Sequence, residues 1–139
     1  MKKFLVILCF IFICHSVQAE NDKFIEALRN CYPYHGSAII NINGVNTKSN
    51  KQMLGWQDNK CTYKETVSFG ENKISTVCKF SKPQIEEIVS VADAYYLTLK
   101  YTKEDIDLSS TDAVQNNPVV RVLNKYLQDP EVCQIVGYE

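Results

Sequence analysis

The sequence lacks the residue patterns that most cofactor and metal sites need. Its five glycines include no Walker phosphate loop and no Rossmann fingerprint, and its cysteines include no Cys-x-x-Cys redox pair or zinc-ribbon spacing. It has two histidines, His15 and His35, and His15 lies in a segment that we expect to be removed. A site that needs two or more histidines is therefore excluded, and we expect no cofactor and no metal.

Residues 1–19 have the three parts of a cleaved secretory signal peptide. Two lysines follow the first methionine, an apolar run of eleven residues extends from Phe4 to Cys14, and Ala19 closes a short exit of small residues. A retained anchor is the weaker alternative, because a membrane-spanning helix needs about 20 apolar residues. We expect residues 20–139 to form one small domain that is exported, periplasmic or extracellular, without stable membrane insertion after cleavage.

The expected mature chain is slightly acidic. Two of the fifteen Lys and Arg lie in the signal segment, so thirteen remain against sixteen Asp and Glu, which gives a formal net charge of −3. A chain without a basic excess has little charge with which to neutralise phosphates. We therefore expect no nucleic acid partner.

Four cysteines remain after the signal segment: Cys31, Cys61, Cys78 and Cys133. An even number in a small exported chain predicts two disulfides, and a metal site or a free nucleophile is the competing interpretation. We favour Cys61 with Cys78, which share a face of adjacent predicted strands, and Cys31 with Cys133. The second bridge would close a loop of about 100 residues and add about 4 kcal/mol. The alternatives, which join Cys31 directly to a strand cysteine, stay open.

Three segments have the periodicity of helices. The first begins at Asn21 or Asp22 and ends before Pro33. The second has the strongest local signature, a capping box of Ser81 and Gln84. Its apolar stripe is wide enough to cover a sheet and consists of Ile85, Ile88, Val89, Ala92, Tyr95, Tyr96 and Leu99.

The third helix follows an acidic stretch. Asn117 and Pro118 open it as cap and first residue, and Pro130 lies just past its end. Residues 102–116 before it form a mobile loop, a functional loop or an unrecognised short helix. A calcium loop starting at Asp105 is disfavoured, because its twelfth position is asparagine instead of the bidentate glutamate that such loops require.

From Ser37 to Phe80 the apolar period changes to two, which predicts antiparallel strands. We expect strands at residues 37–42, 52–57, 60–69 and 72–80, joined by short turns. This register gives one core-facing side, with Leu54, Trp56, Cys61, Tyr63, Val67, Phe69, Ile74, Cys78 and Phe80.

Glu65 and Thr76 interrupt that apolar face and would be cross-strand neighbours. They either lie near an edge or line something. The predicted fold class is α+β, a disulfide-stabilised two-layer domain. Its order is an N-terminal helix, a four-stranded antiparallel meander sheet, and two helices packed on one face.

His35 is a weak catalytic candidate, as a general base paired with a carboxylate. The plainer interpretation is a loop histidine beside Tyr32 and Tyr34. The predicted strands and turns also contain three carboxylates, Asp58, Glu65 and Glu71. A glycosidase needs two carboxylates at a defined separation, and the sequence does not give the separation of these groups.

Several tyrosines lie outside the apolar stripes, where a core role does not explain them. We expect a contact surface from Tyr32, Tyr34, His35 and Tyr101. Without an assembled catalytic set, the sequence predicts a small exported binding module that recognises a protein or a cell-envelope component. The alternatives are a small extracytoplasmic hydrolase that uses His35 with a carboxylate, and a structural cell-envelope protein.

Overall fold

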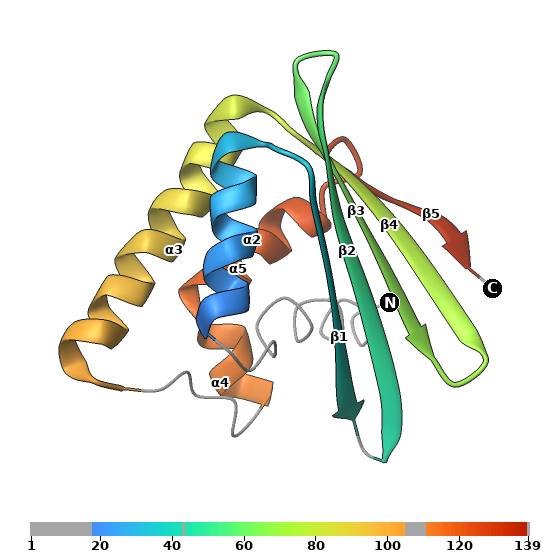
Figure 1. The fold of residues 1–139 in the computed structure, drawn as a ribbon, viewed down its shortest axis with the longest axis horizontal. Coiled ribbons are helices and arrows are strands. Elements are labelled where there is room, and N and C mark those ends of the chain that lie inside the picture. The colour runs from blue at the N-terminus through green and yellow to red at the C-terminus, as the bar shows by residue number, and fades with distance from the viewer. Residues whose placement is uncertain (1–17, 43, 105–110, 139) are drawn as a thin grey trace.

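A five-stranded antiparallel sheet forms one layer of the protein, and helices on one face of that sheet form the other (Figure 1). The structure is a computed structural model that describes residues 18–42, 44–104 and 111–138. In chain order the elements are α2 (Gln18–Asn30), β1 (Tyr34–Ile42), β2 (Val45–Gln57), β3 (Lys60–Phe69), β4 (Asn72–Phe80), α3 (Lys82–Thr102), α4 (Thr111–Asn116), α5 (Pro118–Leu127) and β5 (Cys133–Tyr138). The mixed α+β class is confirmed.

The first four strands form the predicted meander. Gln57 pairs with Lys60 and Phe69 pairs with Asn72, as the short turns required. Asp58 and Asn59 both adopt positive φ, which is the backbone of a two-residue hairpin turn. β2 is longer than expected, because it begins at Val45 instead of Gln52.

A bulge in β2 changes which residues face the core. The pairing with β3 shifts between Met53 and Gly55, so Met53 lies opposite Tyr63 in the place predicted for Leu54. Gly55 has φ of +94°, a conformation that favours glycine. Met53 is buried and Leu54 is exposed, so the prediction for Leu54 is wrong. Trp56 keeps its predicted register opposite Cys61 but is 48% exposed, so it is not a buried core residue.

The C-terminal segment is a fifth strand, which corrects the predicted four-stranded sheet. β5 pairs antiparallel with β4, and the sheet order is β1-β2-β3-β4-β5. No strand was predicted after Pro130. The sequence of β5 does not alternate strictly, because Ile135 and Val136 are adjacent and a glycine follows them.

The two disulfides are present, but the favoured pairing is wrong. Cys31 bonds Cys61 with a Cα–Cα distance of 5.8 Å, and Cys78 bonds Cys133 with 4.0 Å. Cys61 lies opposite Phe80, two positions from Cys78, whereas the unpredicted β5 brings Cys133 directly opposite Cys78. Cys31 ends the first helical segment with a positive φ and reaches the start of β3.

The helices bury one stripe each against the sheet. α2 contributes Phe24 and Leu28, and α3 follows its predicted stripe, with Ser81 N donating to Gln84 Oε1 at 2.8 Å in the capping box. In α5, Asn117 Oδ1 accepts from the backbone amides of the second and third residues after it. The three helix predictions are confirmed, although α2 begins at Gln18 instead of Asn21 or Asp22.

Ion pairs join the helices to one another. Arg29 of α2 donates two hydrogen bonds to Asp93 of α3, at 3.0 and 2.8 Å. Glu87 of α3 accepts from Lys125 at 2.8 Å and from the Tyr126 hydroxyl, both on α5. The helix layer is therefore tied together by polar contacts at its surface as well as by its apolar stripes.

The acidic stretch before α5 contains helix at both ends. α3 extends to Thr102, and α4 forms a short helix directly before Asn117. The short-helix alternative is therefore correct for part of the stretch. The disfavoured calcium loop would span residues 105–116, and its first half, residues 105–110, lies outside the described residues.

Candidate functional site

The lysines of the sheet gather on the face that no described helix covers, which we call the outer face (Figure 1). The five strands contain six lysines, and alternation with buried neighbours points five of them outward. Glu65 is the sole carboxylate in the strands, and it points inward. The outward lysines are Lys48, Lys60, Lys64, Lys73 and Lys79.

Positive charge is concentrated on the outer face. This face has five ammonium groups and no acidic side chain from any strand. The helices carry both signs of charge: Glu26 and Asp93 pair with Arg29, and Glu87 pairs with Lys125. A formal net charge of −1 for the whole chain hides this concentration of lysines.

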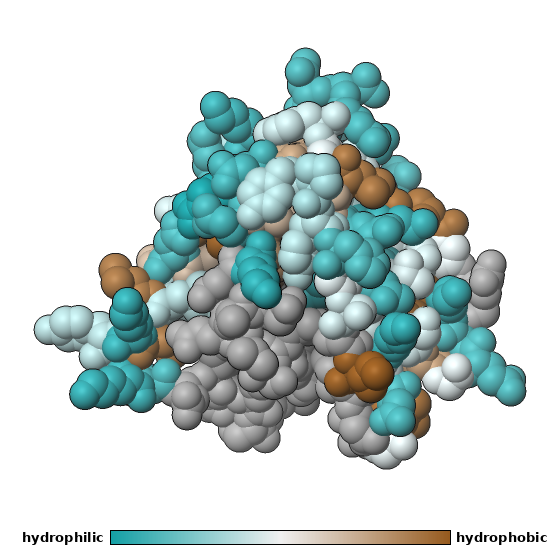
Figure 2. Space-filling model, viewed as in Figure 1, coloured by the Kyte–Doolittle hydropathy of each residue, from teal (hydrophilic) through white to brown (hydrophobic). Residues whose placement is uncertain are grey.

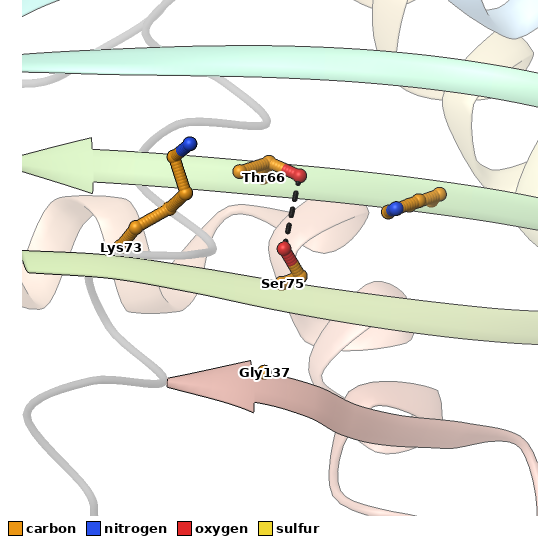
Figure 3. A pocket seen from close by; sticks show the side chains of 5 residues that line it. Thr66, Lys73, Ser75 and Gly137 are labelled. Atoms are coloured by element: carbon orange, nitrogen blue, oxygen red, sulfur yellow. Dashed lines mark hydrogen bonds between the residues drawn. The ribbon is translucent and has the colours of Figure 1, made fainter. Parts of the chain in front are cut away.

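A hollow of about 260 Å³ lies on the outer face where β3, β4 and β5 run side by side (Figure 3). Its lining is polar and consists of Lys64, Thr66, Lys73, Ser75 and Gly137. The Thr66 and Ser75 hydroxyls hydrogen-bond each other at 3.1 Å across the strand pair. In Figure 3 the Lys73 side chain extends from β4 over β3, next to Thr66.

Gly137 keeps the hollow open on the β5 side. It lies directly opposite Ser75, next to a register shift between Ser75 and Thr76. A Cβ at Gly137 would contact only the Ser75 Cβ, at 3.9 Å, which is an ordinary van der Waals distance. The space is therefore empty because glycine has no side chain, and a larger residue would fit there without strain.

The inner face contains a second polar group, which is buried. Glu65 is 1% exposed on the central strand. Its Oε1 accepts from Ser49 Oγ at 2.7 Å, its Oε2 accepts from the Tyr63 hydroxyl at 3.1 Å, and Lys51 is its register partner on β2. Burial raises the pKa of Glu65, and Lys51 and the two hydroxyl donors oppose this rise.

The same burial acts on the tyrosine. The pKa of Tyr63 lies well above its ordinary value, first because the phenol is buried and second because the Glu65 charge disfavours a phenolate. Tyr63 therefore stays protonated and remains a donor to Glu65. A slip of one residue between β2 and β3 would place Glu65 and Lys51 on different faces of the sheet, so we expect this group to fix the pairing of β2 with β3.

Thr76 completes this buried group on β4. It pairs with Glu65 in the register that the sequence predicted, and both residues are buried instead of lying at an edge of the sheet. Among the described residues, Thr76 Oγ1 is the only buried side-chain nitrogen or oxygen without a hydrogen-bond partner. Glu65 and Thr76 are 1% and 5% exposed, and we assign them a structural role in the core.

The structure does not bring together the predicted catalytic groups. His35 is exposed on β1 and pairs with Gln52, whose neighbours Lys51 and Met53 are buried, so His35 belongs to the outer face. Glu65 belongs to the inner face. The sheet thus separates the imidazole from this carboxylate, and the described strands supply no other one.

The carboxylates proposed for glycoside chemistry are also far apart. Asp58 and Glu71 lie in the turns at opposite ends of β3. The ten residues of β3 span about 33 Å. Glycosidase carboxylates are only about 5 to 10 Å apart, so these two cannot form such a pair.

The predicted contact residues do not form one surface. Tyr34 is half-buried and packs against Phe24 with a ring-centroid distance of 6.3 Å, so its ring belongs to the core. Tyr32 follows α2 and is 44% exposed, whereas Tyr101 is 90% exposed near the end of α3. The binding role of these residues and of His35 stays a prediction.

The hollow itself was not predicted. Alternation predicts one core-facing side of the sheet and so leaves Lys64, Thr66 and Ser75 on the solvent side. It missed Gly137, because β5 was not predicted. The available signal was the pair of β-branched residues Ile135 and Val136 in the tail.

Exposed apolar side chains are scattered. Figure 2 shows them on the visible face as small separate groups among hydrophilic residues. A large continuous apolar patch would indicate a protein interface or membrane contact. The large exposed apolar residues in the described ranges are Tyr32, Ile39, Val45, Leu54, Trp56, Leu97, Tyr101, Ile135 and Val136.

Within the described residues, no three His, Cys, Asp or Glu side chains group closely enough to hold a metal ion. None of the described helices has both the length and the apolar composition of a membrane span. Comparisons with known protein families, with curated proteins and with solved structures found no match. The geometry of the site is therefore the only guide to function.

Proposed function

We propose that this chain is a non-enzymatic binding module of an extracytoplasmic compartment, and that its outer face binds a negatively charged protein or cell-envelope component. Its two disulfides are typical of small proteins in oxidising compartments. The observation that carries the proposal is the gathering of five lysines on one sheet face without any strand carboxylate beside them.

A uniform face of this kind has a clear electrostatic consequence. No two of the five lysines are register partners, but their like charges on one face repel each other. A partner with negative charge would neutralise the lysines and would be attracted to this face over a distance of about 10 Å at moderate salt.

The proposal is tested by charge removal on each layer separately. The wild-type protein should bind to an immobilised polyanion such as heparin and elute with salt. A Lys64→Gln/Lys79→Gln variant should elute at clearly lower salt. The matched control is Lys82→Gln/Lys100→Gln, which removes two exposed lysines of α3 and should elute close to the wild type.

Equal elution of the two double variants would contradict the outer face as the binding surface. Failure of the wild type to bind any anionic surface at low salt would reject the proposal altogether. Unfolding of each variant in urea confirms that a change in elution does not come from loss of the fold.

A further inference from the structure

We propose that the outer face binds a linear acidic polysaccharide along β3 and β4, with one acid group of the polymer in the hollow between Lys64 and Lys73. This inference rests on the proposed function and names the chemistry of its partner. Its four supporting observations are the line of lysines, the hydroxyl pair, the gap at Gly137, and the composition of the surrounding face.

The lysines of β3 and β4 form a line along the strands. Lys73 pairs with Ser68 of β3, which lies four residues after Lys64, and Lys64 lies four residues after Lys60. At about 3.3 Å per residue, Lys73 and Lys64 are offset by roughly 13 Å along the strands, and Lys60 lies roughly 13 Å further on. Lys79, opposite Thr62, falls between the last two. Cations repeated along one straight line match a linear polymer that carries acid groups at intervals.

The hydroxyl pair lies midway between Lys73 and Lys64. Thr66 and Ser75 are two positions from each lysine in the register. A hydroxyl has one proton to donate, and one of the two protons is used in the bond between Thr66 and Ser75. The other proton is available to an oxygen in the hollow. Two flanking ammonium groups and one free O–H form a site for an oxyanion such as a carboxylate or sulfate.

The size of the hollow suits one substituent of a polymer. Pockets that enclose a drug-sized ligand measure about 300 to 1,000 Å³. At about 260 Å³ and open to solvent, this hollow admits a single acid group and part of the sugar ring that carries it. Gly137 provides the room on the β5 side.

The face around the hollow favours sugar over the other polyanions. Hydroxyl and amide side chains surround the lysines, and these groups pair with the hydroxyls of a saccharide. They are Asn50, Gln52, Ser68 and Gln134.

Nucleic acid and acidic protein fit this face less well. Single-stranded nucleic acid stacks its bases on aromatic rings, and the outward positions of the described strands contain no Phe, Tyr or Trp. A protein interface has an apolar, often aromatic centre. The large exposed apolar residues near this face lie at its margins instead: Ile39 on β1, Leu54 at the bulge, and Val136 on β5.

The experiment compares four probes on the full chain at fixed salt: polygalacturonate, neutral dextran, single-stranded DNA and polyglutamate. We expect polygalacturonate to bind most tightly and dextran not to bind. Gly137→Val fills the hollow without changing charge and should weaken polygalacturonate binding about tenfold, as should Thr66→Val/Ser75→Ala through loss of a hydrogen bond to a charged group. Ser37→Val, in the same register row but on β1, is the matched control and should bind as the wild type does.

The other outcomes distinguish failure of the polysaccharide inference from failure of the proposed function. If the three polyanions bind alike and Gly137→Val has no effect, the polysaccharide inference is wrong, although the proposed function stands. Preference for DNA or polyglutamate likewise rejects the polysaccharide and leaves the outer face as a general anion surface. If no polyanion binds, both proposals fail. Urea midpoints like that of the wild type establish that the variants are folded.

Discussion

The two disulfides should stabilise the protein by similar amounts but hold different parts of it. Replacing Cys31 and Cys61 together by Ala removes a bridge across 30 residues, and replacing Cys78 and Cys133 together removes one across 55. Alanine is chosen because all four side chains are buried, and serine would place a hydroxyl in the core.

The magnitude follows from loop closure. The chain-entropy relation gives about 4 kcal/mol for each bridge, because its dependence on loop length is logarithmic. A domain of this size is stable by about 5 to 15 kcal/mol in total. Each paired variant should therefore stay folded with clearly reduced stability, whereas the variant without both bridges should lose about 8 kcal/mol and be close to unfolding.

The local effects should differ. β5 has six residues and exposes Ile135 and Val136, so little apolar burial holds it once Cys78–Cys133 is gone. α2 keeps Phe24 and Leu28 buried in the core without its bridge. Hydrogen exchange should show lost protection confined to β5 in the first variant and to the last turn of α2 in the second.

Urea unfolding and peptide mapping without reductant measure these effects. The mapping should yield fragments that link Cys31 to Cys61 and Cys78 to Cys133. A fragment that links Cys61 to Cys78 would refute the topology. A loss below about 1 kcal/mol in both paired variants would refute the estimate from loop closure.

Three further predictions concern single side chains. The raised pKa of Glu65 means that the folded state holds its proton more tightly than the unfolded chain, so the stability from that proton is present at low pH and is lost as the pH rises through the raised pKa. As the pH rises from 4, the free energy of unfolding of Glu65→Gln, measured in urea, should therefore increase relative to that of the wild type. A difference between the two proteins that does not depend on pH would contradict the burial argument. Asn117→Ala should lose about 1 kcal/mol of unfolding free energy, whereas Asn117→Asp, which keeps the capping oxygen, should lose little. Asp93→Asn should cost less than about 1 kcal/mol, since both partners are largely exposed, and the cost should shrink when salt screens the pair with Arg29.

The predictable part of the fold comes from local periodicity. The α3 stripe, the caps at Ser81 and Asn117, and the hairpin at Asp58 each depend on residues a few positions apart. Because these signals involve residues that are close in the chain, they can be recognised in a single sequence.

What was missed depends on contacts between distant segments. The bulge at Gly55 moves Met53 into the place of Leu54, and alternation alone cannot count an inserted residue. β5 forms by pairing with the free edge of β4, which lies far from it in the sequence. Because β5 was not predicted, Cys133 was not expected beside Cys78, and the favoured disulfide pairing was wrong. A cysteine pairing follows the whole topology, so one missing strand changes both bridges.

The charge of the binding face illustrates the same limit in another form. Net charge sums over the whole chain, whereas a partner meets one face, and strand alternation sorted the lysines of β3 and β4 to one side while Glu65 went to the other. The expectation of no nucleic acid partner therefore cannot rest on net charge, and it rests instead on the lack of stacking rings on the outer face.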